Sequence, residues 1–290
     1  MHKTVLLQEV IEGLSLGKDS VVIDGTFGGG GHSMGICKRY RGVKIIALDQ
    51  DKSTLQKKDI NCDITFHNEN FRNLDKVLKK EGIEKVNGII LDLGLSSDQL
   101  ENSGRGFSFT KDEPLLMTMK ENPSLEDLTA QEVVNTWEEH NLADIIYGYG
   151  EERFAKRIAK AIVEARAKSE IKTTFDLVKI IEESVPSFYK RGRLHFATKT
   201  FQAIRITVND ELGALSVGLA KGFDCLESGG RMAVISFHSL EDRIVKRFYK
   251  AKEKEKIAKL LNKKPITSNR EEVKNNPRAR SAKLRIMQKI

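Results

Sequence analysis

The chain has 290 residues, of which 39% are hydrophobic and 31% are charged. This length and composition predict one large globular domain or two, and they exclude a fibrous or low-complexity protein. No apolar run reaches about 18 residues and the first residues lack the apolar core of a signal peptide, so we expect a cytoplasmic protein with no membrane span.

The net charge of +8 and the pI of about 9.2 favour a polyanionic partner, of which nucleic acid is the commonest. The cysteines Cys37, Cys62 and Cys225 are widely spaced, and none belongs to a Cys-x-x-Cys pair. We therefore expect neither a disulfide framework nor a cysteine zinc site, and we expect no metal; each cysteine is predicted to be a small buried side chain.

Residues 4–14 predict a short amphipathic helix, and residues 21–24 predict a buried strand. Four consecutive glycines, 28–31, follow this strand and lead into a predicted helix at 33–39. Glycines permit positive φ angles and let a ligand approach main-chain N–H groups. Such a loop after the first strand of an open α/β sheet lies where cofactors bind.

Further strands are predicted at 43–48, 64–66 and 86–92, with helices at 52–58 and 74–80 between them. This alternation predicts a parallel, doubly wound sheet. Acidic residues end the first, second and fourth strands, and because the carboxyl ends of parallel strands share one edge, we expect these acids to lie close together. They are Asp24, Asp49 and Asp92.

Strand patterns nearly vanish between residues 109 and 206, where helices are expected instead. One of these, 151–167, has a basic face that is either solvated or in contact with phosphates. The α/β pattern then resumes with a helix at 211–223 and a strand at 231–237. Residues 250–264 predict a solvated helix or a mobile arm, and a basic tail follows. We therefore predict an α/β domain formed by 1–108 and 207–290, with an all-helical domain, 109–206, inserted into it.

Three interpretations of the glycine loop compete. A phosphate-binding loop requires a Lys-Ser/Thr pair after the glycines, which this chain lacks. A dinucleotide loop requires a glycine at position 33, where this chain has Ser33. An acid before the glycines and another after the second strand favour S-adenosylmethionine (SAM) instead. The helix N–H groups then suit the SAM carboxylate, Asp24 the ammonium region, and Asp49 the ribose diol.

The fourth strand bears on the methyl acceptor. No cysteine ends a strand, which disfavours methylation of a ring carbon, whereas a nitrogen acceptor mainly needs positioning. Asp92, with Ser96 and Ser97, is placed to accept hydrogens from an exocyclic amine and so to localise its lone pair. His238 follows the strand at 231–237 and is either an ordered core histidine or part of the acceptor site.

The chain closely resembles the bacterial MraW/RsmH methyltransferases, which use SAM to methylate the exocyclic N4 amine of a cytosine in the decoding region of 16S rRNA. The resemblance runs from residue 4 to the tail, and its most specific segments are 24–33, 88–97, 105–109, 149–152, 200–206, 229–231, 235–243 and 280–285.

The resemblance implies a Rossmann-like SAM-dependent methyltransferase domain with an inserted helical substrate-recognition domain, and RNA bound between the two. Asp49 would hold the ribose and Phe71 would pack near the adenine, although alone Phe71 also suits the core and His32 also suits a helix cap. The remaining implied cofactor residues are Gly30, Gly31, His32, Asp92 and Gln99. The implied RNA contacts are Arg105, His195, Lys199, Arg205 and Ser239. The implied partner is 16S rRNA within the small ribosomal subunit, and a homodimer is compatible with the sequence.

Two departures fall on the expected RNA side. The family usually has an acid and an arginine where this chain has Leu116 and Thr118, and a proline and an arginine where it has Phe196 and Lys199. Lysine does not replace the planar fork of arginine. These departures leave open an alternative: a SAM-binding ribosome-assembly factor, or a paralogue with a shifted RNA target. A small-molecule or protein methyltransferase is disfavoured by the basic charge.

Overall fold

The structure, a computed structural model, describes residues 4–55, 62–124 and 126–290. The chain divides into two compact units, here called the sheet unit (Met1–Gly94 and Leu212–Ile290) and the helical unit (Leu95–Glu211). The predicted boundaries lay at 108/109 and 206/207. The segment after Gly94 groups with the helical unit because Leu95 and Phe107 pack against the hydrophobic core of that unit.

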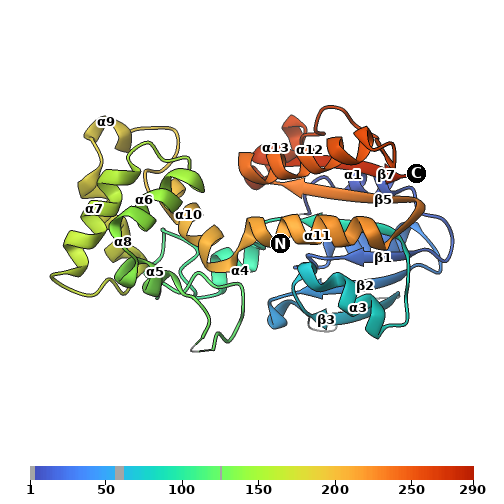
Figure 1. The fold of residues 1–290 in the computed structure, drawn as a ribbon, viewed down its shortest axis with the longest axis horizontal. Helices are drawn as coiled ribbons and strands as arrows, with labels where there is room; N and C mark the ends of the chain where they lie inside the picture. The colour runs from blue at the N-terminus through green and yellow to red at the C-terminus, as the bar shows by residue number, and fades with distance from the viewer. Residues whose placement is uncertain (1–3, 56–61, 125) are drawn as a thin grey trace. The chain divides into compact units, whose positions relative to one another are not determined.

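The sheet unit contains a seven-stranded sheet in the order β3-β2-β1-β4-β5-β7-β6 (Figure 1). Strands β1 to β5 pair in parallel, whereas β7 is antiparallel to both of its neighbours. The predicted doubly wound α/β architecture is thus confirmed. The strands are β1 (Val21–Asp24), β2 (Lys44–Asp49), β3 (Asp63–Asn68), β4 (Val86–Asp92), β5 (Leu226–Ser236), β6 (Ala258–Leu260) and β7 (Lys283–Lys289).

Helices cover both faces of this sheet, and Figure 1 shows α11 running along the direction of its strands. Successive strand residues point to opposite faces. Val22 therefore joins the core under α1 and α2, whereas Ile23 joins the core under α3, α11 and α12. The α-helices of the unit are α1 (Leu7–Leu14), α2 (Gly31–Arg39), α3 (Leu74–Lys80), α11 (Glu211–Cys225), α12 (Ser239–Lys254) and α13 (Arg270–Asn275). The 3-10 helices are η1 (Lys52–Leu55), η2 (Phe71–Asn73) and η3 (Pro277–Ser281).

Two local predictions differ from the structure. Where a helix was expected over 52–58, the chain forms only the short turn η1, and residues 56–58 lie outside the described part. Residues 250–254 complete α12 and are mostly exposed, as expected for a solvated helix, whereas the alternative of a mobile arm over 250–264 is wrong. After α12 the chain forms β6, and β7 inserts between β5 and β6. Arg285 in β7 is 6% exposed because its guanidinium pairs with Asp242 of α12 at 2.7 Å.

The helical unit has one core, to which Ile158, Ile162 and Phe201 belong. The regular structure described in it is helical, apart from an isolated bridge between Pro114 and Thr173. Its helices are α4 (Ser97–Asn102), α5 (Ala130–Thr136), α6 (Glu139–Gly148), α7 (Ala155–Arg166), α8 (Thr174–Ser184), α9 (Ser187–Lys190) and α10 (Thr198–Asn209). No helix in the described parts of the chain is long and apolar enough to cross a membrane.

Candidate functional site

The glycine loop of the sheet unit is tied to the strands on both sides of β1. The Gly25 N–H donates to the Ile90 carbonyl of β4 at 2.9 Å, and the Phe27 N–H donates to the Leu48 carbonyl of β2 at 3.0 Å. Because β2 and β4 flank β1, the loop lies where the strand order reverses. This point, at the carboxyl ends of the strands, is where open α/β sheets bind ligands.

Glycines are required at two positions of this loop. Gly30 has a φ of 74°, and a Cβ there would lie 2.6 Å from the Phe27 ring. Gly31 opens α2, and a Cβ there would lie 1.7 Å from the Thr4 hydroxyl oxygen. The backbone therefore runs closely past both neighbours, and the positive φ at Gly30 strongly favours glycine there.

Asp24 is buried at the end of β1, with 1% of its surface exposed. Its carboxylate accepts hydrogen bonds from the Ser33 hydroxyl at 2.6 Å and from the Thr26 N–H at 3.3 Å. Burial raises the pKa of Asp24 to about 6, although these two hydrogen bonds act against the shift. The side chain thus connects β1 to the first turn of α2.

Asp49 at the end of β2 shapes the same loop. Its carboxylate accepts the Gly28 N–H at 2.7 Å and the Asp51 N–H at 2.8 Å. Gly28 and Asp49, which are 21 residues apart in the sequence, are therefore in direct contact. Asp49 stands at the position from which we predict that it holds a ribose.

Asp92 at the end of β4 differs from the other two acids. Its Oδ1 atom is buried and has no hydrogen-bond partner among the described residues. Its backbone N–H donates to the Thr26 hydroxyl at 2.6 Å, so the carboxylate lies beside the glycine loop. Burial raises the pKa of Asp92 to about 8, and the negative charges of Asp24 and Glu241 add to the shift. The structure thus presents an unused acceptor at the predicted methyl-transfer position.

His32 and Phe71 flank these acids. The His32 Nδ1 atom lies 3.7 Å from Asp92 Oδ2, and its Nε2 atom lies 3.1 Å from the Val5 carbonyl. The Phe71 ring packs closely against Gly218 of α11, where an added Cβ would lie 2.5 Å from the ring. His32 therefore contacts a predicted site residue and does not cap α2, since Gly30 occupies the N-cap position and His32 is the second residue of the helix.

His238 caps α12. Its Nδ1 atom accepts the Glu241 N–H at 3.5 Å, while the Glu241 carboxylate accepts the His238 N–H at 3.3 Å and the Phe237 N–H at 2.8 Å. Glu241 is 3% exposed, so this reciprocal cap places a buried carboxylate near Asp92. Ser239 is the first residue of α12. His238 thus has a clear structural role, and its predicted role at the acceptor stays a prediction.

The side chains of the sheet unit fit SAM. Asp24 and Glu241 are buried and Asp92 is partly buried beside them, and no lysine or arginine contributes to the shifted pKa values of Asp24 and Asp92. An ammonium or sulfonium group bound beside them would offset this negative charge. The unpartnered Asp92 oxygen offers a hydrogen-bond acceptor in the same place. These carboxylates, together with Asp49, therefore suit a cationic ligand that carries a ribose.

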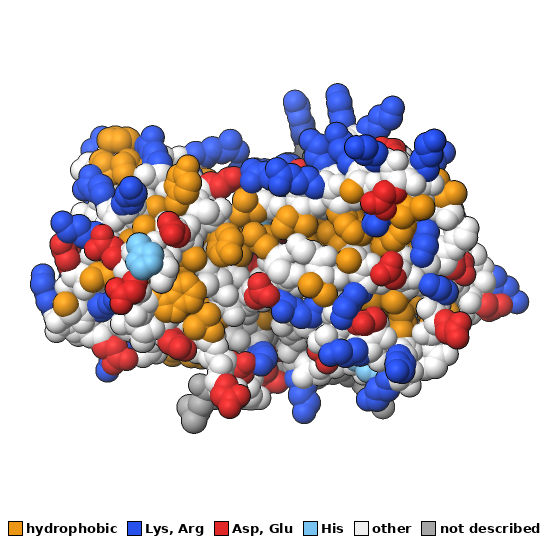
Figure 2. Space-filling model, in the orientation of Figure 1, with side chains coloured by type: hydrophobic (Ala, Val, Ile, Leu, Met, Phe, Trp, Pro, Cys, Tyr) orange, Lys and Arg blue, Asp and Glu red, His pale blue; other side chains and the backbone are white. Residues whose placement is uncertain are grey.

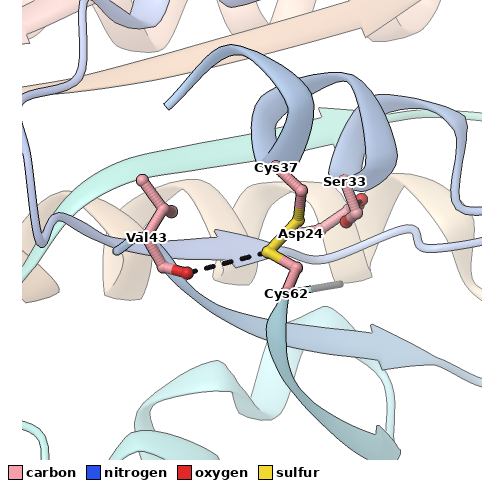
Figure 3. The surroundings of a disulfide bond; sticks show 5 residues. All are labelled: Asp24, Ser33, Cys37, Val43 and Cys62. Carbon is pink, nitrogen blue, oxygen red and sulfur yellow. Dashed lines mark hydrogen bonds between the residues drawn. A yellow bond between two sulfur atoms is a disulfide. The ribbon is translucent and has the colours of Figure 1, made fainter. Parts of the chain in front are cut away.

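A disulfide in the sheet unit corrects the cysteine prediction. Cys37 of α2 is bonded to Cys62, which immediately precedes β3, with 5.8 Å between their Cα atoms (Figure 3). Cys225 is free and partly buried. Ser33, which binds Asp24, lies one turn before Cys37 in the same helix. The disulfide thus tethers the helix that follows the glycine loop, and only the fold brings its two sulfur atoms together.

In the helical unit, Ser96 and Gln99 form a reciprocal cap at the start of α4. The Ser96 N–H donates to the Gln99 side-chain oxygen at 3.0 Å, and the Gln99 N–H donates to the Ser96 hydroxyl at 3.1 Å. Gln99 is 7% exposed. Ser97 is the first residue of α4, and its side chain lies outside the described part. These bonds give Ser96 and Gln99 a structural role besides the predicted ones.

Two predicted RNA contacts are engaged within the helical unit. Arg105 is 7% exposed, and its guanidinium donates to the Met119 carbonyl at 3.0 Å. Arg205 makes two parallel hydrogen bonds to Glu211, at 2.8 and 2.9 Å. Both arginines therefore connect segments of their own unit instead of standing on its surface.

His195 is exposed, and its ring stacks on Phe109 with 4.5 Å between the ring centroids. Partial burial lowers the pKa of His195, so the neutral form is favoured. The Lys199 amine donates to the Glu151 carbonyl at 2.7 Å. A flat neutral ring at the surface suits base stacking, whereas Lys199 is partly engaged.

The departures from the family pattern are accommodated by packing and hydrogen bonds. Phe196 and Thr118 are buried, with 9% and 4% of their surface exposed. The Leu116 carbonyl accepts the Ala130 N–H at the start of α5. These residues contribute to the interior of the helical unit.

The sequence reasoning also missed a cluster of aromatic and basic side chains around α9. Residues 186–194 carry two aromatic residues and three cations in nine positions, and this local composition was a usable indication.

Comparisons with known proteins agree with this geometry. The sequence profile of the MraW methylase family matches residues 1–290. Ribosomal RNA small subunit methyltransferase H from Ruminiclostridium cellulolyticum is 45% identical, and the match covers 100% of this chain and 99% of that protein. The protein of the same name from Clostridium botulinum is 44% identical, with the same coverage. An rRNA methylase structure from Streptococcus thermophilus is similar only at a TM-score of 0.42 and 13% identity, over 100% of this chain and 99% of that one, and adds nothing to the assignment. The chain belongs to the MraW methylase family.

Proposed function

We propose that this protein transfers a methyl group from SAM to the exocyclic N4 amine of a cytosine in the decoding region of 16S rRNA, within the small ribosomal subunit. Relatives that are 41–45% identical over the whole chain carry the name ribosomal RNA small subunit methyltransferase H, which supports rRNA as the substrate. The observation that carries the choice of an amine is the buried, unpartnered Oδ1 of Asp92 beside the glycine loop.

The cofactor is SAM, which supplies a methyl group bonded to a positively charged sulfur. The N–H groups at the start of α2 would bind its carboxylate, because a helix N-terminus favours anions. Asp24 and Asp92 would face its positive charges, and Asp49 would hold the ribose while it shapes the loop. Phe71 would pack near the adenine.

Asp92 would act on the amine of the acceptor. The lone pair of this amine is delocalised into the cytosine ring, so the amine is a weak nucleophile. A carboxylate that accepts its N–H groups localises the lone pair. As the nitrogen bonds the methyl carbon and the carbon–sulfur bond breaks, the amine loses one proton, which the Asp92 carboxylate would accept. Ser96, Ser97 and His238 are further candidates for orienting the amine.

The deciding experiment measures methyl transfer from labelled SAM to purified small subunits and to naked 16S rRNA, with the product nucleoside identified. We expect N4-methylcytidine at one position. A different methylated nucleoside would contradict the cytosine assignment and leave rRNA methylation standing. Absence of transfer to both substrates would contradict the proposal and favour a SAM-binding assembly factor.

A further inference from the structure

An aromatic cluster surrounds one arginine in the helical unit. The guanidinium of Arg153 lies over three rings, at 4.8 Å from Phe154, 5.1 Å from Tyr189 and 5.5 Å from Phe188. The Phe154 ring meets the Tyr189 ring edge to face, with 5.0 Å between centroids. Arg153 and Phe154 precede α7, whereas Phe188 and Tyr189 belong to α9. The cluster therefore joins two segments that are more than 30 residues apart in the sequence.

A buried carboxylate holds this cluster in place. Glu152 is fully buried and accepts hydrogen bonds from the Tyr189 hydroxyl and, at 2.8 Å, from the Phe154 N–H. Burial raises the pKa of the Tyr189 hydroxyl, and the bond to Glu152 adds to the shift, so the hydroxyl stays a donor. The position of α9 is thereby set by an internal bond before any ligand arrives.

The outer side of the cluster is exposed and basic. Phe188 is 64% exposed, and Arg153, Arg191 and Arg193 are also exposed. Neither Arg191 nor Arg193 has an acidic partner within the described parts of the chain. Figure 2 shows hydrophobic surface bordered by Lys and Arg side chains over α9. We call Arg153, Phe188, Arg191 and Arg193 the aromatic–arginine surface.

This combination fits one kind of partner. An aromatic ring with open surface stacks on an unpaired base, and arginines beside it bind phosphates or stack in their turn. A duplex would not offer a base face to Phe188, because its bases are stacked on each other. We propose that the aromatic–arginine surface binds a single-stranded segment of RNA, with one base on Phe188 and phosphates at Arg191 and Arg193; this rests on the proposed function.

The test compares matched variants of the full chain by fluorescence polarisation with a single-stranded oligoribonucleotide and with a duplex of the same sequence. Phe188→Ala should weaken single-strand binding about 10-fold, as expected for one lost stacking contact, and Phe188→Trp should restore it. Phe175→Ala is the control, because Phe175 is 47% exposed on α8, outside the cluster. Duplex binding should be unchanged in all three variants.

The arginines are tested by salt dependence. Replacing both Arg191 and Arg193 by alanine should reduce the slope of log affinity against log salt by about 1.4, which is the value for two lost phosphate contacts on a single strand. The control replaces Lys168 and Lys179, two exposed cations of the same unit, and should leave the slope unchanged.

Equal losses in the Phe188 and Phe175 variants, or equal losses on duplex and single strand, would overturn the inference. If Phe188→Ala keeps both RNA binding and methyl transfer, the inference fails while the proposed function stands. If the unaltered protein methylates no rRNA but its single-strand binding depends on Phe188, the proposed function fails while the surface stands. Preference for anionic lipid vesicles over RNA would also overturn it.

Discussion

In the sheet unit, Asp24 and Glu241 are buried, Asp92 is partly buried, and the charges of the other two raise the pKa of Asp92. In the helical unit, the cations of the aromatic–arginine surface face solvent, and the buried acid, Glu152, is hydrogen-bonded to Tyr189. Burial makes the first group costly unless a cationic ligand offsets it. Exposure leaves the second group available to a large anionic partner. The contrast separates a site for a small cofactor from a surface for RNA.

The largest expected effect tests whether Asp92 acts in methyl transfer and not in RNA binding. Asp92→Asn should lower the rate of methyl transfer about 10³-fold, because the proton acceptor is lost, and leave single-strand RNA affinity unchanged. Single-turnover kinetics and polarisation measure the two. Glu84→Gln, which removes an exposed acid of the same unit, is the control for charge alone. A rate within a few-fold of that control would remove Asp92 from the mechanism.

The disulfide is expected to support the sheet unit only. Its two cysteines are 25 residues apart, so replacing both Cys37 and Cys62 by serine should lower the free energy of unfolding by about 3 kcal/mol. Cys225→Ser is the matched control. Urea unfolding with and without a reductant measures the effect, and a reductant should change the parent protein but not the double variant. Equal stability in both would show that the bond is not formed in solution.

The buried acids also predict a pH dependence. The pKa values of Asp24 and Asp92, about 6 and about 8, lie above those of an unfolded chain. The folded state therefore binds more protons than the unfolded state, and stability falls as pH rises from about 4 to about 8. We expect a loss of several kcal/mol over this window, reduced in Asp92→Asn and in the presence of SAM. A flat profile in the parent protein would contradict the burial of these carboxylates.

Arg205 tests whether an ion pair of the helical unit serves stability or RNA binding. Because it is bonded twice to Glu211, Arg205→Ala should lower the free energy of unfolding by about 2 kcal/mol. The salt slope of RNA binding should not change. Arg157→Ala, at an exposed position of α7, should leave stability nearly unaltered. If Arg205→Ala instead reduces the salt slope at full stability, Arg205 contacts RNA as the sequence resemblance implies.

The glycine loop gives the smallest expected effect. Gly30 and Gly82 both have positive φ angles, but a Cβ at Gly82 would meet nothing within 4 Å. Gly82→Ala should cost about 1 kcal/mol, and Gly30→Ala about 1 kcal/mol more, because of the contact with Phe27. Calorimetry should show weaker SAM binding for Gly30→Ala alone. Equal effects of Gly30→Ala and Gly82→Ala on SAM binding would show that the loop does not contact the cofactor.

Much of the sheet unit could be predicted because its evidence is local. Apolar strands, the turn at 28–31 and the acids at strand ends each occupy a few consecutive residues, and parallel connection then brings Asp24, Asp49 and Asp92 to one edge. The helical unit was predicted only as a class. Which arginines would be exposed did not follow, because Arg105 and Arg205 are engaged by partners that sequence periodicity does not identify.

The sequence by itself determined the fold class, the place of the glycine loop and the family, because these depend on short-range patterns and ordered motifs. The tertiary structure decided the rest. It paired Cys37 with Cys62, inserted β7 beside β5, and assembled Arg153 with Phe188. Each of these contacts joins residues 25 or more positions apart, and the free energy that forms them comes from packing of the whole unit, which no local pattern encodes.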